Sequence, residues 1–519
     1  MVFKGRKGIQ IGSECGVTKQ HKRSKEEPFL MSKSSARQRI GQLELDLLET
    51  KPAVIEFDGD DVSGNAGVLL AAQAERLTGL IKGATARLDD HRTASLIKHS
   101  QFELVAQRVF QIVAGFPAGD DSDFLKGDPV IKAGTGRNPL SGEDLASQPT
   151  QSRVEGKRKY KELYRLSEWL VDYYIQCQRR RPKHLILDFD GSAIETYGVQ
   201  LQAFYRGGPY QKCMYFPLFV FDQNGWLLVA ALRPGDEGEV KLALPVLKKL
   251  VGKLRKAWPG LRITVRADGA FTHKDLYRWM DDNNVQYVMG IKHNNSLLSK
   301  SRDERKKAKT KFQRKYGEPK YKGKDGTKLK MKKMSEVRSI KDPKKRRKSF
   351  ADTQSRRVRV YGDFLYQAGS WDRERRVISR CDYTDEGHDV RYVVTNIRYY
   401  TAAQIYEDIY CQRALAEMWI KNMKETRCTR LSCSQFKANM FRLLLHALAY
   451  LLIHQVRQRL PEHCQRMSVA QFQRNFVHVA VQVSERNDLA CFRIAKSYHA
   501  AREFRLASKR LGATNPLAA

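Results

Sequence analysis

Four polar residues recur on one side of a predicted helix. In AQIYEDIYCQRALAEMWIKNMK, residues 403–424, they are Tyr410, Arg413, Glu417 and Lys424, at offsets of 0, 3, 7 and 14. An α-helix has about 3.6 residues per turn, so these offsets place the four side chains on one stripe of a mostly apolar helix. A carboxylate flanked by two cations and a phenol suits a metal-bound or polyanionic partner. The alternative is a solvated face on which Arg413 and Glu417 form an ordinary i,i+4 ion pair.

Three aspartates belong to two predicted strands upstream of that helix. HLILDFDGS, from residue 184, places Asp188 and Asp190 on the same face of a buried strand, and LRITVRADG ends another strand at Asp268. A buried carboxylate needs a metal or a cation as its partner. Two strands that each carry such a group therefore indicate a site, whereas the alternative is that these aspartates only terminate strands in turns.

The elements that must position these aspartates follow an α/β pattern. Residues 184–292 predict three strands in a meander, with Gln223-Asn224-Gly225 as a hairpin turn, followed by a helix, a strand, a helix and a strand. Right-handed crossovers then give a mixed five-stranded sheet with helices on its faces. The first and fourth strands are adjacent at its centre, so Asp190 and Asp268 should face one crevice.

Segments of different composition flank this core. Residues from about 41 to 115 carry apolar residues at helical spacing. Residues 300–350 contain 23 basic and 6 acidic residues, which favours a flexible or partly ordered polyanion-binding segment. The predicted organisation is a basic flexible arm (1–40), a helical N-terminal domain (41–160), the first part of the α/β core (161–299), a basic and β-rich insertion (300–398), the helix with the polar stripe and a packing helix that complete the core (399–460), and a helical basic tail (461–519).

The overall charge narrows the class of partner. Among 519 residues, 94 are basic and 57 acidic, for a net charge of +37, which favours a nucleic-acid backbone or an anionic membrane. No stretch approaches about 18 uninterrupted apolar residues, so we expect no membrane partner. Nine cysteines without a CxxC pair are typical of isolated thiols in a reducing cytoplasm. Cys428, Cys433, His446 and His454 fit no standard zinc spacing.

These residues together resemble a known family. The spacing Tyr410-x2-Arg413-x3-Glu417-x6-Lys424, preceded by LDFDGS and RADGAF, is similar to that of the DDE transposases of bacterial insertion sequences, in the branch with a Tyr-Arg-Glu-Lys signature. The resemblance runs over about residues 67–457. It implies a ribonuclease-H-like catalytic core with a β-rich insertion, completed by a catalytic helix and a packing helix (399–460), and a helical N-terminal DNA-binding domain (41–160). It also implies a cytoplasmic, nucleoid-associated location in a bacterium.

The resemblance also implies a catalytic centre and its cofactor. Asp190, Asp268 and Glu417 would form the metal-binding catalytic triad, and Asp188 is an alternative first ligand because it shares the strand face of Asp190. Two Mg²⁺ ions, replaceable by Mn²⁺, would activate water and neutralise the leaving oxygen of a phosphodiester. Water would free a 3′-hydroxyl at the transposon end, and that hydroxyl would then attack target DNA.

DNA contacts and partners follow from the same resemblance. Tyr410, Arg413, Lys421 and Lys424 would hold phosphates of the bound end. Trp371, in GSWDRERR, would stack on a base flipped out near the cut, the alternative being a buried structural tryptophan. The partners would be double-stranded DNA, both as terminal inverted repeats and as target, and a second copy of the chain in a homodimer on paired ends.

Two other functions are compatible with these residues. A structure-selective DNA nuclease would use the same core and triad, and inverted repeats in the flanking DNA would argue against it. A non-catalytic DNA-binding relic of a transposase would keep the DNA contacts alone, and a cleavage assay would identify it. The function expected from the resemblance is cleavage at transposon ends and strand transfer into target DNA.

Overall fold

The computed structural model describes residues 43–45, 53–56, 58–208, 210–319, 342, 345 and 356–514. The chain divides into two compact units, Met1–Gly59 and Asp60–Ala519. In the first unit, β1 (Leu43–Leu45) pairs antiparallel with β2 (Ala53–Ile55). The predicted basic arm, residues 1–40, lies outside the described residues. The second unit contains every element that positions the candidate site.

A large mixed sheet lies at the centre of the second unit. Among the described residues its strand order is β12-β13-β14-β11-β10-β4-β8-β9, and β10 is parallel to both of its neighbours. The predicted contact between the first and fourth strands of the core, here β4 and β10, is therefore confirmed. The strands are β4 (His184–Gly191), β8 (Leu218–Asp222), β9 (Leu227–Ala231), β10 (Arg262–Ala267), β11 (Gln286–Ile291), β12 (Arg357–Tyr366), β13 (Arg375–Thr384) and β14 (Gly387–Thr395).

Strands of the β-rich insertion extend this sheet instead of forming a separate layer. β14 pairs antiparallel with β11, from Ile291 opposite Tyr392 to Val288 opposite Thr395. Without that pairing β11 would be a long unpaired edge, which soluble proteins avoid. Tyr392, Val393 and Val394 are all buried, as expected of a strand covered on both faces. The predicted five-stranded sheet was therefore incomplete.

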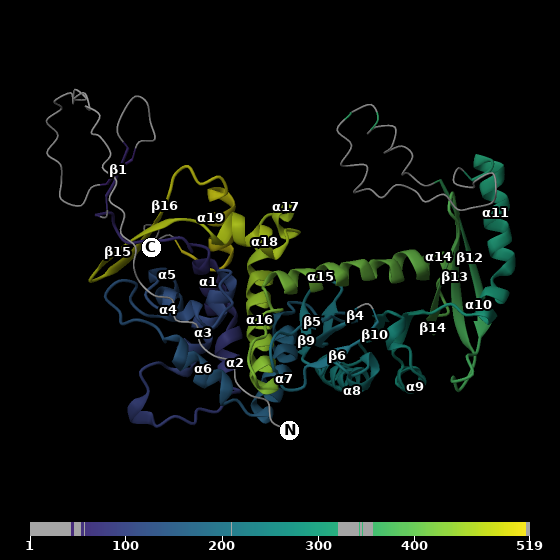
Figure 1. The fold of residues 1–519 in the computed structure, drawn as a ribbon, viewed down its shortest axis with the longest axis horizontal. Coiled ribbons are helices and arrows are strands. Elements are labelled where there is room, and N and C mark those ends of the chain that lie inside the picture. Colours follow the sequence, from purple (N-terminus) through teal and green to yellow (C-terminus); the bar gives the residue numbers. More distant parts are fainter. Residues whose placement is uncertain are drawn as a thin grey trace, which may run out of the picture. The chain divides into compact units, whose positions relative to one another are not determined.

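Crossover helices and short elements complete the sheet region (Figure 1). Apolar side chains of β4, β10 and β11 form one hydrophobic core with α8 and α9 on one face of the sheet. The short strands form a small separate sheet of β5 (Ile194–Glu195), β6 (Phe204–Arg206) and β7 (Lys212–Tyr215). The helices of this region are α8 (Glu239–Ala257), η2 (Gly269–Phe271), α9 (Lys274–Asp282), α10 (Asn295–Lys300) and α11 (Arg302–Tyr316).

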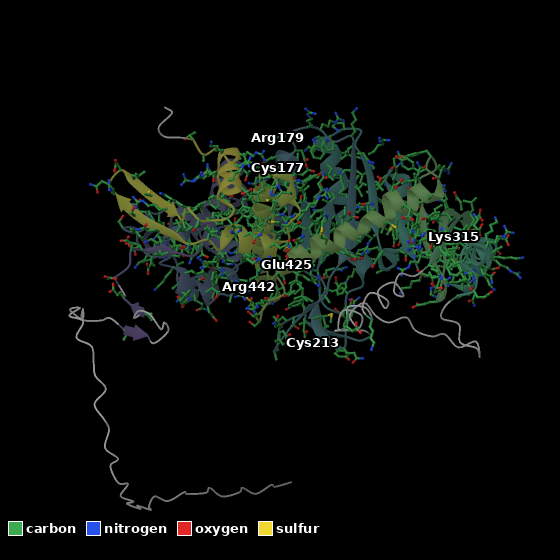
Figure 2. All side chains as sticks on the ribbon, turned by 90° about the horizontal axis from the view of Figure 1, so that it is seen from above. Cys177, Arg179, Cys213, Lys315, Glu425 and Arg442 are labelled. Carbon is green, nitrogen blue, oxygen red and sulfur yellow. The ribbon has the colours of Figure 1, made fainter. Side chains whose placement is uncertain are left out.

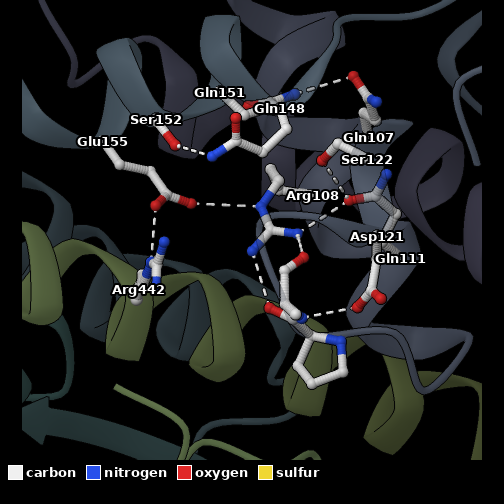
Figure 3. A network of polar contacts seen from close by, with 12 residues as sticks. Gln107, Arg108, Gln111, Asp121, Ser122, Gln148, Gln151, Ser152, Glu155 and Arg442 are labelled. Carbon is white, nitrogen blue, oxygen red and sulfur yellow. Dashed lines mark hydrogen bonds and ion pairs between the residues drawn. The ribbon is translucent and has the colours of Figure 1, made fainter. Parts of the chain in front are cut away.

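Helices that precede the sheet pack in the same unit as the sheet. Figure 3 shows a buried polar network in which Glu155 accepts hydrogen bonds from Arg108 at 3.3 Å and from Arg442 at 2.6 Å. Removing one partner from a buried ion-pair network leaves a charge uncompensated, so this network fixes the early helices to α16. The elements are η1 (Ala94–Leu96), α1 (Val68–Thr78), α2 (Leu80–Thr85), α3 (Gln101–Val113), α4 (Asp121–Leu125), α5 (Pro129–Thr135), α6 (Gln148–Gly156), α7 (Tyr160–Cys177) and α16 (Phe436–Arg457).

Most of the predicted N-terminal DNA-binding domain, residues 41–160, shares its hydrophobic core with the rest of the second unit. From Asp60 onward these residues belong to the same compact unit as the sheet, and α1, α3 and α7 share one hydrophobic core with α16. A fragment that begins at residue 160 would expose that core. Recognition of specific DNA ends by this region stays a prediction, and surface substitutions in the full chain are the way to test it.

Helix α16 is the central apolar element of this core. It is the one helix in the described part of the chain that is long and apolar enough to cross a membrane, and 83% of its most apolar window is buried inside the protein. Its apolar side chains therefore have partners within the fold. Burial lowers the pKa of both His446 and His454 to about 3, so these two imidazoles are neutral at physiological pH.

The C-terminal region differs from the predicted helical tail. Residues 481–494 form a β-hairpin, which pairs with β3 (Val62–Ser63). Val481 and Val483 are buried and alternate with polar residues, and this period of two specifies a strand. The prediction of helix was therefore wrong here. The elements are α17 (Glu462–Gln465), α18 (Val469–Phe472), η5 (Gln473–Val477), β15 (Val481–Arg486), β16 (Leu489–Ile494) and α19 (Ala501–Arg510).

Candidate active site

Asp190 and Asp268 lie at the carboxyl ends of two neighbouring parallel strands. Asp190 is the penultimate residue of β4, and Asp268 directly follows β10. The register places Asp188 opposite Arg266, so its continuation brings Asp190 level with Asp268. The Asp190 side chain is 13% exposed and that of Asp268 is 42% exposed. Two carboxylates therefore open on the same edge of the sheet.

The third carboxylate comes from a helix of mixed geometry. α14 (Ala402–Gln404), the π-helical turn η3 (Ile405–Tyr410), the 3₁₀ turn η4 (Cys411–Arg413) and α15 (Ala414–Glu425) follow one another as a single rod (Figure 1). The predicted regular α-helix over residues 403–424 is therefore wrong between residues 405 and 413.

A contact from the sheet accompanies this change of helix type. Arg266 Nη1 donates to the carbonyl oxygen of Ile409 at 2.9 Å, which gives that carbonyl a partner outside the helix. π-turns and 3₁₀ turns inside helices are common at functional sites and hinges. Here Tyr410 ends the π-turn and Arg413 ends the 3₁₀ turn, whereas Glu417 lies in the regular helix α15.

The hairpin between β8 and β9 anchors α15. Gly225 in this hairpin has a φ of 85° and lies against the indole of Trp419, so that a Cβ at this position would be 2.8 Å from the ring. The Tyr450 hydroxyl of α16 donates to the Gly225 carbonyl at 2.8 Å. The predicted Asn-Gly turn therefore also serves as the contact that holds α15 against the sheet.

Arg413 joins the three carboxylates. Its Nη2 is 2.9 Å from Asp190 Oδ2 and 3.8 Å from Asp268 Oδ2, and its Nη1 is 3.2 Å from Glu417 Oε1. The three carboxylates do not all lie within 4.8 Å of one another, so they surround the guanidinium instead of meeting directly. The structure thus brings together Asp190, Asp268 and Glu417 around one cation.

Electrostatics at this cluster favour additional positive charge. The pKa of Asp190 is raised to about 6, chiefly because of burial, and the charges of Asp268 and Glu417 raise it further. Arg413 opposes the shift but does not cancel it. Three carboxylates with one neighbouring cation are the oxygen-rich, negatively charged donor set that Mg²⁺ or Mn²⁺ prefers. The residues present therefore fit a divalent metal.

Asp188 has a different partner from Asp190. Both of its carboxylate oxygens accept hydrogen bonds from Arg266, at 2.6 Å from Nε and 2.6 Å from Nη2, and the two side chains are 1% and 2% exposed. Burial raises the pKa of Asp188, and the Arg266 guanidinium opposes that shift. Both oxygens of Asp188 are thus engaged by Arg266, whereas Asp190 is paired with Arg413.

A cleft of about 850 Å³ adjoins Asp268. Its lining includes Tyr410 and three cationic side chains: Arg305, from the basic segment 300–350, and Lys292 and Arg391, which no sequence motif identifies. Gly290 also lines it, and a Cβ at this position would overlap the Tyr410 hydroxyl. Lys292 directly follows β11 and Arg391 lies on β14, so the pairing of these two strands, which local sequence does not show, brings the two cations to one surface.

The other predicted DNA contacts are more dispersed. Lys421 is exposed and Lys424 is half-buried on α15, and their spacing of four and seven residues from Glu417 puts them on its side of that helix. Their link to the carboxylate cluster is α15 itself, which carries both lysines and Glu417.

Trp371 lies away from the carboxylate cluster. It stands in the turn between β12 and β13, with its ring 5.5 Å from those of both Tyr277 and Tyr366. The register puts this turn beyond Thr395, at the edge of the sheet where β10 and β11 begin, whereas Asp268 lies where β10 ends. These contacts favour the alternative of a structural tryptophan.

A second acidic cluster occurs outside this region. Ligand atoms of Asp89, His91 and Glu162 lie within 4.8 Å of one another. However, Asp89 accepts a hydrogen bond from Arg165 at 2.6 Å, and Glu162 accepts one from Arg158 at 3.0 Å. Arginines therefore already neutralise both carboxylates, which makes this cluster a poorer metal site than the one around Arg413.

Comparisons with known proteins address the class of this site. A family model described as transposase DDE domain group 1 matches residues 45–516. A solved synaptic complex of piggyBac transposase with hairpin DNA is similar with a TM-score of 0.35 and 11% identity, covering 86% of this chain and 82% of that one. No curated protein sequence matches significantly. Because the family model spans most of the chain, including the three carboxylates and Arg413, the protein belongs to the DDE-domain transposases of group 1.

Proposed function

We propose that the protein cleaves DNA strands at transposon ends and joins them to target DNA, with Asp190, Asp268 and Glu417 as the ligands of divalent metal ions. The observation that carries this proposal is the convergence of three carboxylates, from β4, β10 and α15, on a single cation at one edge of the sheet. The strand order β9-β8-β4-β10-β11 supports a ribonuclease-H-like core. Pairing of two DNA ends would involve a homodimer.

The chain's own residues supply the positions that this chemistry needs. Bound Mg²⁺ or Mn²⁺ would lower the pKa of an attacking water and neutralise the leaving oxygen. Asp190 is fixed within β4, and Asp268 is oriented by accepting a hydrogen bond from the backbone N–H of Ala270 at 2.9 Å. Glu417 has a side chain that is 67% exposed and can adjust to its ligand.

The neighbouring cleft supports duplex or single-stranded DNA as the bound polymer. Lys292 and Arg391 line this cleft and are exposed, and the Tyr410 hydroxyl lies against Gly290. Cations at such a surface neutralise phosphates and release counterions. We therefore assign the phosphates next to the reacting bond to Tyr410, Arg413, Lys421 and Lys424, and the phosphates further along the strand to the cleft.

Substitution of Gly290 tests the role assigned to Tyr410. Gly290→Ala introduces a Cβ that displaces the Tyr410 hydroxyl, while the ring can move into the cleft. We expect the cleavage rate to fall about tenfold to a hundredfold, the worth of one hydrogen bond to a charged group, with little loss of thermal stability. Gly252→Ala, at an exposed helix position where a Cβ meets nothing, should leave cleavage unchanged. If the Gly290→Ala variant cleaved DNA at the normal rate, Tyr410 would have no role in cleavage.

Helix α11 forms a second basic surface. Residues 302–316 of the predicted flexible segment are helical, and Ala308 and Phe312 are buried against the β-insertion while the basic side chains project outward. Figure 2 shows Lys315 among the outward side chains at this end of the molecule. Residues 320–341 lie outside the described part of the chain.

Neutralising α11 should lower affinity without changing specificity. We expect replacement of Lys306, Lys307, Lys309 and Lys311 by Gln to flatten the plot of log K against log salt by about 0.9 for each phosphate that the helix no longer neutralises. Fluorescence anisotropy with duplexes of two unrelated sequences measures the affinity at each salt concentration. Replacement of four exposed lysines of α8 by Gln, Lys241, Lys248, Lys249 and Lys256, is the control for removal of charge alone. An unchanged slope in the α11 variant would show that this helix does not bind DNA.

Product mapping tests the proposed reaction against its alternatives. The full chain is incubated with Mg²⁺, DNA that contains its own flanking sequences, and a second plasmid. We expect cuts at the ends of the inverted repeats, with free 3′-hydroxyls, and molecules in which these ends are joined to the plasmid. Cuts that depend on DNA structure without joined products would favour the nuclease, and binding without cuts would favour the non-catalytic relic.

A further inference from the structure

We propose that Arg413 occupies the divalent-metal site of the free protein and has to leave it when metal and DNA are bound. The inference rests on the proposed function, because the metal is expected at the same three carboxylates. Among the described residues, Arg413 is the only cationic side chain within 4.0 Å of Asp190, Asp268 or Glu417. It therefore stands where a metal ion would have to be.

The charges exclude simultaneous occupancy. One guanidinium faces three carboxylates, and its side chain is only 13% exposed, so its charge is poorly screened by water. A divalent ion that contacted the same oxygens would lie within a few ångströms of this guanidinium and repel it. The metal and Arg413 thus compete for Asp190 in particular, whose Oδ2 is the nearest acceptor at 2.9 Å.

Arg413 is held in this place by charge more than by a complete set of hydrogen bonds. Its Nε is buried without a hydrogen-bond partner among the described residues, and its contact with Asp268, at 3.8 Å, is too long for a hydrogen bond. The residue ends the 3₁₀ turn η4, directly before α15 begins. Irregular turns of this kind act as hinges in helices, so a second arrangement of this side chain costs little.

DNA provides the destination for the displaced side chain. The cleft begins at Asp268 and contains Tyr410, one turn before Arg413 on the same rod. A phosphate there offers the guanidinium a bidentate partner with the geometry that arginine prefers. DNA and metal then favour the same arrangement, and linkage requires each to raise the affinity for the other. The free protein accordingly has a weak metal site.

Metal titration of the DNA-free full chain tests this inference. Mn²⁺ affinity is measured by isothermal titration calorimetry for the natural chain, Arg413→Gln, Arg413→Lys and Lys421→Gln. We expect Arg413→Gln to bind Mn²⁺ at least about tenfold more tightly than the natural chain, and Arg413→Lys to show a smaller gain because an ammonium cannot reach all three carboxylates. Lys421→Gln removes an equal charge from the same helix without contacting the triad, and its affinity should stay near that of the natural chain.

The outcomes separate this inference from the proposed function. Equal or weaker Mn²⁺ binding by Arg413→Gln overturns the inference, and if that variant does not fold by circular dichroism, equal binding by Arg413→Lys overturns it instead. A similar gain in Lys421→Gln would also overturn it, because general charge would then explain the effect. Asp190→Asn is the test of the metal site itself, since unchanged Mn²⁺ binding in that variant would place the metal elsewhere and reject the proposed function.

Discussion

Asp190→Asn, Asp268→Asn and Glu417→Gln are each expected to reduce Mg²⁺-dependent cleavage of a transposon-end duplex at least about a thousandfold, equivalent to about 4 kcal/mol of transition-state stabilisation. Each substitution keeps the shape of the side chain and removes one charge from the cluster around Arg413. Affinity for the duplex, measured without divalent metal, should change little, because the phosphate contacts come from other residues. Single-turnover cleavage and anisotropy measure the two effects on the same preparations.

Stability provides the control for these variants. Because the pKa of Asp190 is raised to about 6, its ionised form destabilises the metal-free fold above that pH, and the cost is relieved as the pH falls through 6. At pH 7.5 in the presence of a chelator, Asp190→Asn should therefore unfold at the same temperature as the natural chain or higher. A variant that lost both activity and several degrees of stability would have failed by unfolding, and full activity in all three would reject an enzymatic role of the cluster.

The second large effect is expected at Asp188 and Arg266. Asp188→Asn or Arg266→Met should each destabilise the fold by about 3 to 5 kcal/mol, because each leaves its buried partner charge uncompensated. Urea unfolding measures this change. The double variant Asp188→Leu with Arg266→Met removes both charges and should recover much of the stability, although the helix would still lack the Arg266 hydrogen bond to Ile409.

This pair also tests the choice of first metal ligand. If Asp188→Asn is stable and inactive while Asp190→Asn cleaves normally, the first ligand is two residues earlier than assigned. If Asp188→Asn is unstable and retains activity at low temperature, Asp188 supports the sheet and Asp190 binds the metal. The bidentate contact of Asp188 with Arg266 predicts the second result.

The strand pattern was sufficient to predict that Asp190 and Asp268 lie at the same end of neighbouring strands. Alternation put Asp188 and Asp190 on one face of β4, and the crossover rule made β10 its neighbour, so that Asp190 and Asp268 reach the same edge. The partner of Asp188 could have been found by the same reasoning, because Arg266 precedes Asp268 by two residues and shares its face. Neither the register of the two strands nor the burial of the pair is visible in local sequence.

Other features depend on contacts between distant segments. The π-turn and 3₁₀ turn at residues 405–413 accompany a hydrogen bond from Arg266, 143 residues away from Ile409, and helix periodicity alone predicts a regular helix there. The addition of β14 to the edge of β11 likewise arises from long-range pairing. For Trp371, the family resemblance suggested stacking on a flipped base, whereas the register places this residue at the opposite end of the strands from Asp268.

The central claim is that Asp190, Asp268 and Glu417 hold the metal ions that serve DNA cleavage. Its most direct test is anomalous diffraction from crystals of the full chain bound to an end duplex and soaked in Mn²⁺. The account predicts Mn²⁺ peaks in contact with these three carboxylates, with Arg413 turned away from them toward a phosphate. Peaks only at Asp89, His91 and Glu162, or Arg413 still between the three carboxylates beside bound DNA and no peak there, would contradict it.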